Sequence, residues 1–190
     1  MNNIDRAFNF YSKHICDAEK IQLLKDNKLK VAGHIHSVIW ELFGAILTGQ
    51  KAEGITGADL VGWEVKSAKG GGSYEYQYHR NAHLEKLDED CIVSHLYCSY
   101  SDEYDGLEVR VMRGCELSDE YFSKWKSLCI KKYSNPDNLR FRKSIGFGYI
   151  QQHGLLVLQV SKGKLVFRKD DFEEVLGLQK TINYMSKDKE

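Results

Sequence analysis

The spacing of apolar residues along the chain predicts an alternation of helices and strands. Between residues 30 and 50, apolar side chains recur three or four positions apart, as they do on a helix with one core-facing side. The expected stripe consists of Ile35, Val38, Ile39, Leu42, Phe43 and Leu47. Residues 91–100 and 107–113 suit two strands, and the intervening Asp105-Gly106 is a favourable turn sequence.

The second half of the chain continues this mixed pattern. Ser118 can cap a helix that runs to about Tyr133. The expected core side chains of this helix are Phe122, Trp125 and Leu128. Further elements are expected as strands at 147–150, 155–160 and 164–167, a short helix at 171–178, helices within 1–30 and a frayed tail at 185–190. The predicted fold class is α/β, with a central mixed β-sheet flanked by α-helices in one domain over residues 1–190.

A tight hairpin is predicted around Val61-Gly62. These two residues can occupy the turn, which sets Leu60 opposite Trp63. The next pair outward is Asp59 and Glu64, on adjacent antiparallel strands. Directly opposed Cβ atoms lie roughly 4.5–5.5 Å apart, so these two carboxylates are expected to be neighbours.

Asp59 and Glu64 have chemistry suited to a divalent cation. Two buried carboxylates this close repel each other unless a cation or a proton compensates. Oxygen ligands favour Mg²⁺, which is commonly held by one or two carboxylates together with water and substrate phosphate. Lys66 follows Glu64 by two residues and shares its face, where its ammonium group can orient a water or stabilise a transition state. The group predicts metal-assisted phosphodiester cleavage, and the alternative is a surface hairpin with an incidental ion pair.

Glu41 supplies a further carboxylate on the helix predicted between residues 30 and 50. It lies beside the apolar stripe, and an acid on a largely buried helix needs a partner. A nearby metal ion or lysine would serve as that partner. The alternative is that Glu41 caps or pairs at the edge of the helix.

The residues after the hairpin have the pattern of a polar ribbon. Gly70-Gly71-Gly72 permits a bent backbone, and residues 73–79 then alternate between tyrosines and polar side chains. A two-stranded ribbon fits the major groove, where glutamine can pair with adenine and arginine can bind guanine. The expected DNA-binding residues here are Ser73, Tyr76, Gln77, His79, Arg80 and Asn81. An amphipathic strand with its tyrosines packed on a helix is the alternative.

The charge distribution permits a nucleic-acid partner. The chain has 27 basic and 27 acidic residues, whereas nucleic-acid-binding domains are usually basic overall. Basic residues nevertheless gather in one segment, as Lys131, Lys132, Arg140, Arg142 and Lys143. We expect Arg140, Arg142 and Lys143 to bind DNA, although a solvated helix end and loop would account for the same charges.

The composition mainly excludes other classes. With 42% hydrophobic residues in 190, the chain can bury one core. It has neither a recognisable signal peptide nor an apolar run long enough to span a membrane, which predicts a cytoplasmic protein. Five cysteines lack CxxC spacing, so neither a zinc site nor a disulfide framework is expected. His34 and His36 would point apart on a helix and are not expected to share an ion.

Four segments together resemble the active-site region of the PD-(D/E)XK endonucleases, particularly their MutH-type branch. They are Lys30-Val-Ala-Gly33, Ile39-Trp-Glu41-Leu-Phe-Gly-Ala, Gly57-Ala-Asp59-Leu and Gly62-Trp-Glu64-Val-Lys66-Ser. In that branch a helix glutamate precedes an aspartate and a Gly-x-Glu-x-Lys-Ser/Thr strand. The resemblance covers residues 30–67. It implies that Asp59, Glu64 and Glu41 bind the metal and form the catalytic cluster with Lys66.

A looser similarity links other segments to the small homodimeric type II restriction enzymes of the PvuII type. It rests on the polar ribbon at 73–81, a strand-then-helix unit at 107–125 and the segment Tyr149–Gly154. The chain departs from that pattern in its shorter spacing from Asp59 to Glu64 and in having no run of histidines in the ribbon. These departures leave the target sequence open.

The resemblance implies a type II restriction endonuclease that hydrolyses double-stranded DNA at a short specific sequence. Mg²⁺ is the implied cofactor, and Mn²⁺ can substitute for it. A homodimer is implied, with contacts expected from the helices in residues 1–30, and so is a cognate DNA methyltransferase in the same host. Two rival functions stay open: a MutH-like nicking repair endonuclease that needs a partner protein, and a catalytically inactive DNA-binding module.

Overall fold

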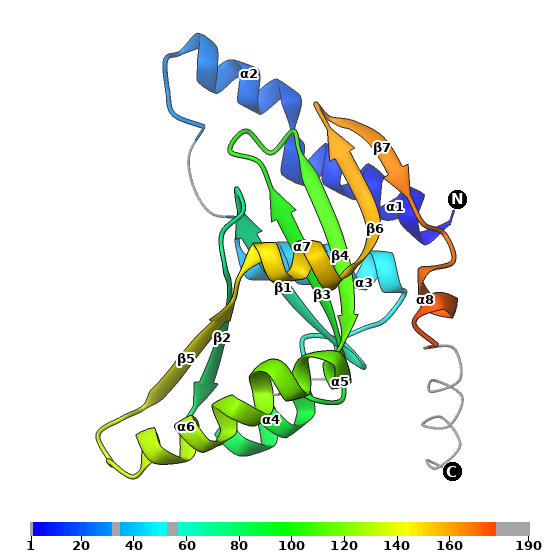
Figure 1. Cartoon of the computed structure of the whole chain (residues 1–190). Coiled ribbons are helices and arrows are strands. Elements are labelled where there is room, and N and C mark those ends of the chain that lie inside the picture. Colours follow the sequence, from blue (N-terminus) through cyan, green and yellow to red (C-terminus); the bar gives the residue numbers. More distant parts are fainter. Residues whose placement is uncertain (1, 32–34, 53–56, 178–190) are drawn as a thin grey trace.

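A five-stranded mixed sheet forms the centre of the computed structural model, which describes residues 2–31, 35–52 and 57–177 (Figure 1). Its strands, in spatial order, are β1 (Trp63–Lys69), β3 (Ser94–Tyr100), β4 (Leu107–Arg113), β6 (Leu155–Ser161) and β7 (Lys164–Arg168). β1 and β3 pair in parallel, and the other neighbours pair antiparallel. The expected mixed sheet is confirmed, and β1 is one of its two edge strands.

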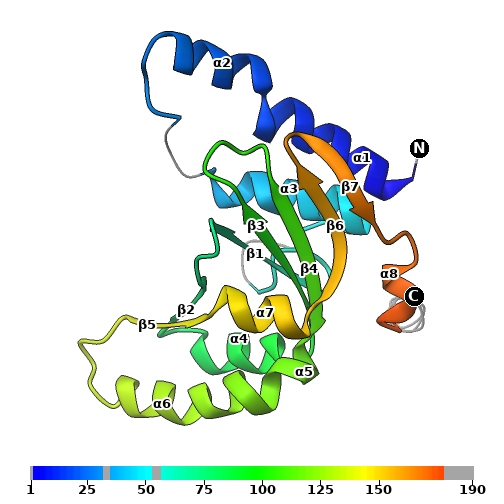
Figure 2. The same cartoon turned by 45° about the horizontal axis from the view of Figure 1, so that its top comes forward.

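Helices from the first quarter of the chain cover one face of this sheet. They are α1 (Asn3–Phe10), the π-helical segment η1 (Tyr11–Cys16), α2 (Ala18–Asp26) and α3 (Ser37–Thr48). Figure 2 shows α1 and α3 on the same side of the strands, with α2 extending beyond the sheet. Side chains of α1 and η1 that are at most 3% exposed, Ile4, Ala7, Tyr11 and Ile15, belong to this core. The same residues are therefore not available for the dimer contact expected of residues 1–30.

The other face carries a second core, which is rich in aromatic side chains. Its helices are α4 (His83–Asp90), α5 (Gly114–Leu117), η2 (Ser118–Phe122), α6 (Ser123–Tyr133) and α7 (Phe147–His153). The short helix α8 (Phe172–Val175) instead belongs to the first core, where Phe172 packs against Trp63. Helices thus flank the sheet on both faces, as the sequence predicts.

A separate two-stranded antiparallel ribbon projects from the second face (Figure 1). It consists of β2 (Tyr74–His79) and β5 (Arg140–Ile145). The ribbon follows β1 through Gly70 and Gly71, whose positive φ angles of 53° and 75° favour glycine at the bend. Tyr74, Tyr76 and Tyr78 are each 1% exposed, so one face of the ribbon is buried against the helices.

The apolar stripe of α3 differs from the predicted one. Phe43 and Leu47 are buried as expected, but Val38 and Leu42 are 59% and 46% exposed. Trp40 is 1% exposed and stacks on Tyr100 at 5.0 Å between ring centroids. Because α3 is apolar on more than one side, periodicity did not decide its orientation, and the large indole faces the core.

Three other predicted elements need correction. Residues 147–150 form helix α7 rather than a strand, so tertiary packing overrides the strand propensity of their aromatic side chains. Ser118 caps no helix, because η2 continues from α5 and leads into α6. Leu128 is 44% exposed, and Cys129 is buried in its place. The basic residues at 140–143, for which a solvated loop was the alternative, are part of strand β5.

Within the described ranges, no helix is long and apolar enough to cross a membrane.

Candidate active site

The turn at Val61-Gly62 forms as predicted. Leu60 and Trp63 exchange two backbone hydrogen bonds of 2.9 Å, and Gly62 has a φ of 73°. The pairing stops at this bridge, so the expected strand ladder at Asp59 is wrong. Asp59 Oδ2 instead accepts a hydrogen bond of 2.8 Å from the Val65 N–H. That bond fixes the Asp59 carboxylate against the beginning of β1.

Glu64 and Lys66 share one face of β1, as their alternate positions require. Lys66 Nζ pairs with Glu64 Oε1, and it lies 5.0 Å from the centre of the Tyr76 ring. The other oxygen of Glu64, Oε2, accepts a hydrogen bond of 2.9 Å from Lys86 Nζ on α4. The side chain of Glu64 is 4% exposed. Both carboxylate oxygens are thus paired with ammonium groups.

A cavity of about 280 Å³ opens at this edge of the sheet. Its lining residues are Ser37, Trp40 and Glu41 of α3, Asp59, Val65, Lys66 and Ser67 at β1, and Glu75 of β2. The structure therefore brings three of the four predicted catalytic residues, Glu41, Asp59 and Lys66, around one space. Glu64 is not among the residues that line this cavity, and its buried carboxylate lies between Lys66 and Lys86.

The two acids near β1 have opposite electrostatic surroundings. Burial and the neighbouring Glu64 charge raise the pKa of Asp59 to about 6, and Glu41 contributes in the same direction. Burial also opposes ionisation of Glu64, but Lys66 and Lys86 outweigh it and lower the pKa of Glu64. Asp59 is therefore the carboxylate that lacks sufficient positive charge, which is the condition that a divalent cation relieves.

Two carboxylates at the cavity could contribute ligands to a divalent cation. Asp59 and Glu41 present carboxylate oxygens, the ligand type that Mg²⁺ prefers. The buried Trp40 Nε1 has no hydrogen-bond partner among the residues described. As they stand, no three His, Cys, Asp or Glu side chains in the described ranges form a group able to hold a metal ion. Ligation by Glu64 would require its carboxylate to leave Lys86.

The exposed face of the ribbon presents polar side chains from both strands. Gln77 lies opposite Arg142, and His79 lies opposite Arg140. Gln77 Nε2 and His79 Nε2 are 2.8 Å apart, and Arg142 Nε lies 3.9 Å from Glu75 Oε1. This face combines amide, imidazole and guanidinium groups in one strip. Ser73 and Asn81 are exposed beside it.

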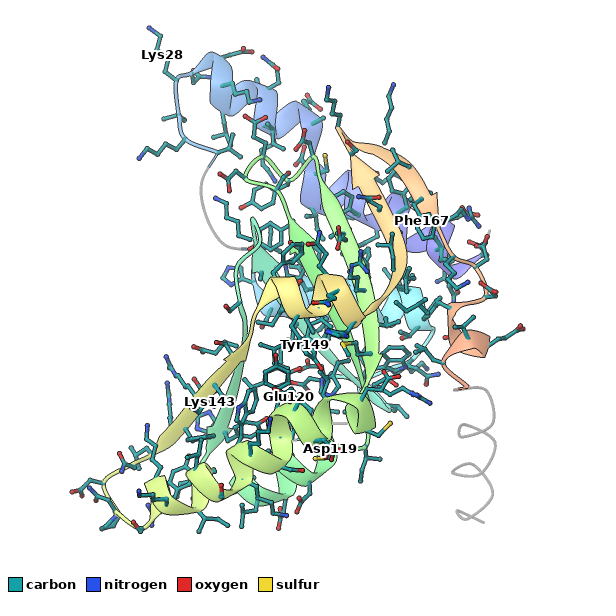
Figure 3. The ribbon with its side chains drawn as sticks, viewed as in Figure 1. Lys28, Asp119, Glu120, Lys143, Tyr149 and Phe167 are labelled. Atoms are coloured by element: carbon teal, nitrogen blue, oxygen red, sulfur yellow. The ribbon has the colours of Figure 1, made fainter. Side chains whose placement is uncertain are left out.

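Three expected DNA contacts lie elsewhere. Tyr76 is buried among the helices, where its hydroxyl binds Tyr97 and His95. Arg80 donates a hydrogen bond of 2.9 Å to the carbonyl oxygen of Asn135. It therefore links the end of β2 to the loop between α6 and β5. Lys143 lies opposite Tyr76 in the register and is therefore on the packed face, where it is half-buried. Figure 3 shows it on the ribbon, on the opposite side of the view from Phe167.

Sequence reasoning missed Lys86 and Trp40, and it assigned Glu75 to the ribbon without placing it at the cavity. Lys86 could have been noticed from its spacing, because Glu89 and Asp90 follow it by three and four residues on a helix. Glu75 alternates with Gln77 on the polar face of the ribbon. No sequence signal distinguishes Trp40 from an ordinary core residue. His34, for which no metal-binding role was expected, lies outside the described residues, and so do Ala32 and Gly33 of the Lys30–Gly33 segment.

No protein-family model matches the chain, and a search of curated proteins finds no match. The geometry of the site is therefore the basis for any statement about function.

Proposed function

We propose that this chain is a Mg²⁺-dependent endonuclease with a restriction-endonuclease-like fold, which cuts double-stranded DNA at a short specific sequence. One observation carries the proposal: Glu41, Asp59 and Lys66 surround a single cavity at the edge strand β1. A helix acid, a pre-strand acid and a strand lysine are three of the four site elements that the PD-(D/E)XK resemblance implies, and the fourth, the strand acid Glu64, is the direct neighbour of Lys66. The polar ribbon begins a few residues after them in the chain.

Asp59 and Glu41 would hold the metal ion, with Glu64 as a third ligand once it turns toward the cavity. A bound Mg²⁺ ion supplies an activated water and neutralises charge on the phosphate. Lys66 reaches the same cavity, where its ammonium group orients the water or stabilises charge on the phosphate oxygens.

The ribbon would read the DNA sequence. Gln77 can pair with adenine, and Arg142 opposite it can bind guanine, so one cross-strand pair presents two base-reading groups. Arg140 and His79 extend this strip and can also bind phosphates. Ribbon and cavity are joined by Glu75, which belongs to β2 and lines the cavity.

A homodimer is part of the proposal, since two-fold symmetry would match a palindromic site and place one cavity at each strand. α2 extends from the body, and Leu23 on it is 56% exposed, which makes α2 the remaining candidate contact from residues 1–30. A cognate DNA methyltransferase is expected in the same host, where it would protect the recognition sites. Sedimentation of the protein on its DNA as a monomer would contradict the dimer.

Incubation of the purified protein with supercoiled plasmid and Mg²⁺, followed by sequencing of the ends, tests the proposal. We expect double-strand breaks at one short sequence. Nicked circles that become linear only after a partner protein is added would instead favour the MutH-like nicking enzyme. Binding of DNA without cleavage in either Mg²⁺ or Mn²⁺ would favour an inactive binding module.

A further inference from the structure

Lys86 on α4 lies at the centre of a buried ion cluster behind the cavity. Its ammonium group contacts Glu64 Oε2 at 2.9 Å, Asp90 Oδ1 at 2.5 Å and Glu89 Oε2 at 3.2 Å. The side chain of Lys86 is 18% exposed and that of Asp90 is 1% exposed. Burial opposes the charge on Lys86, but Glu64 and Asp90 raise its pKa, so Lys86 remains an ammonium ion.

Asp90 is held in place from two other elements. Tyr78 of the ribbon donates a hydrogen bond of 2.8 Å to Asp90 Oδ2, and the Asp90 carbonyl oxygen lies 2.8 Å from His95 Nε2 on β3. Lys86 is therefore anchored by a rigid partner on its own helix. Its contact with Glu64 crosses from α4 to β1, the strand that bears the candidate catalytic residues.

This arrangement lets Glu64 change partners without leaving a buried charge unpaired. If Glu64 turned toward the cavity, Lys86 would keep Asp90 and Glu89, and Glu64 would exchange one ammonium group for the metal ion. Breaking a buried ion pair is costly when one partner keeps an uncompensated charge. Here both Lys86 and Glu64 would still have partners of opposite charge. Asp59, which already lines the cavity, would gain the same cation.

We infer that Lys86 is a positioning residue that holds Glu64 away from the cavity in the metal-free protein and competes with a divalent cation for that carboxylate. This inference rests on the proposed function, because it assumes that Glu64 is a metal ligand. Its consequence is that Lys86 weakens metal binding before DNA is present. A lysine that merely stabilised the fold would have the opposite effect, since its loss would loosen the site.

A measurement of Mn²⁺ binding to the DNA-free protein separates these two roles. The electron paramagnetic resonance signal of free Mn²⁺ reports how much of the ion is bound. Specific binding is the part of the measured Mn²⁺ binding that is lost in Asp59→Asn. We expect Lys86→Met to bind Mn²⁺ about tenfold more tightly, because a positive charge next to a ligand is lost. We expect Asp90→Asn to bind it about threefold more weakly, because Lys86 then keeps Glu64 as its main charged partner. A general loss of structure would weaken binding in both variants.

Two further variants serve as controls. Lys126→Met removes an exposed lysine that pairs with Asp88 of α4 at 2.5 Å, and its Mn²⁺ affinity should equal that of the wild type. Lys86→Arg keeps the positive charge, so its Mn²⁺ affinity should lie closer to that of the wild type than to that of Lys86→Met. Unchanged or weaker binding by Lys86→Met, in protein shown by circular dichroism to be folded, would overturn the inference but leave the proposed function intact. Absence of specific Mn²⁺ binding by the wild type would contradict both.

Discussion

Asp59→Asn should stabilise the metal-free protein while abolishing cleavage. The Asp59 carboxylate is half-buried, close to Glu64, and has a raised pKa. Its ionised form is therefore an unfavourable feature of the folded state when no cation is bound. Asparagine removes the charge and can still accept the hydrogen bond from the Val65 N–H through its amide oxygen. Functional sites commonly store such destabilisation.

The size of the effect follows from the pKa of Asp59. Its value rises from 3.8 to about 6 on folding. Between these two values the folded state binds more protons than the unfolded state, so stability falls as pH rises through the window and the full penalty is present above pH 6. At about 1.36 kcal/mol per pKa unit, the penalty has a ceiling of about 3 kcal/mol. Solvent screening of a half-buried group reduces the expected gain to about 1–2 kcal/mol at pH 7.5 and about half of that at pH 5.

Urea unfolding in EDTA at pH 7.5 and pH 5 measures this difference in unfolding free energy. Asp88→Asn is the matched control, because Asp88 is exposed and pairs with Lys126 on the surface, and it should change stability by less than about 0.5 kcal/mol at both pH values. A loss of stability in Asp59→Asn at pH 7.5, or a gain that does not depend on pH, would refute the electrostatic account of the site.

Three other predictions concern the scaffold and the ribbon. Burial lowers the pKa of His95 to about 4. The unfolded state therefore binds more protons between pH 4 and 6.5, and stability falls as the pH drops through that window. In urea unfolding, His95→Gln should remove up to about 3 kcal/mol of this pH dependence. In the same assay, Gly114→Ala should destabilise the protein by more than about 3 kcal/mol, because a Cβ there would lie 2.4 and 2.6 Å from two backbone carbonyl oxygens. Gly148 has open space around it, so Gly148→Ala should not lose stability. Arg140→Ala should lower the slope of log affinity for DNA against log salt by about 1, and an unchanged slope would exclude a phosphate contact.

The local part of the site was predictable because it depends on short-range geometry. Alternation along a strand fixes Glu64 and Lys66 on one face, and the Val61-Gly62 turn brings Asp59 to the beginning of β1. The alternation of tyrosines with polar residues likewise gave the two faces of β2. These features hold whatever the rest of the chain does.

The orientation of Glu64 was not predictable, because it depends on how α4 packs against β1. Lys86 lies 22 positions further along the chain, and no local rule relates it to Glu64. The side of α3 that faces the core also depends on tertiary packing. For this reason the sequence predicted wrongly that Val38 and Leu42 are buried, whereas Trp40 faces the core instead. Strand β5 was missed because its partner, β2, is distant in sequence.

Single-turnover cleavage of DNA by Lys66→Ala tests the central claim most directly, with binding of the same DNA measured in Ca²⁺. Lys69→Ala is the control, since Lys69 lies on the same strand and pairs with Asp102 rather than lining the cavity. We expect Lys66→Ala to bind DNA like the wild type but not to cut it in Mg²⁺, and Lys69→Ala to cut normally. Cleavage by Lys66→Ala at the wild-type rate would contradict the central claim.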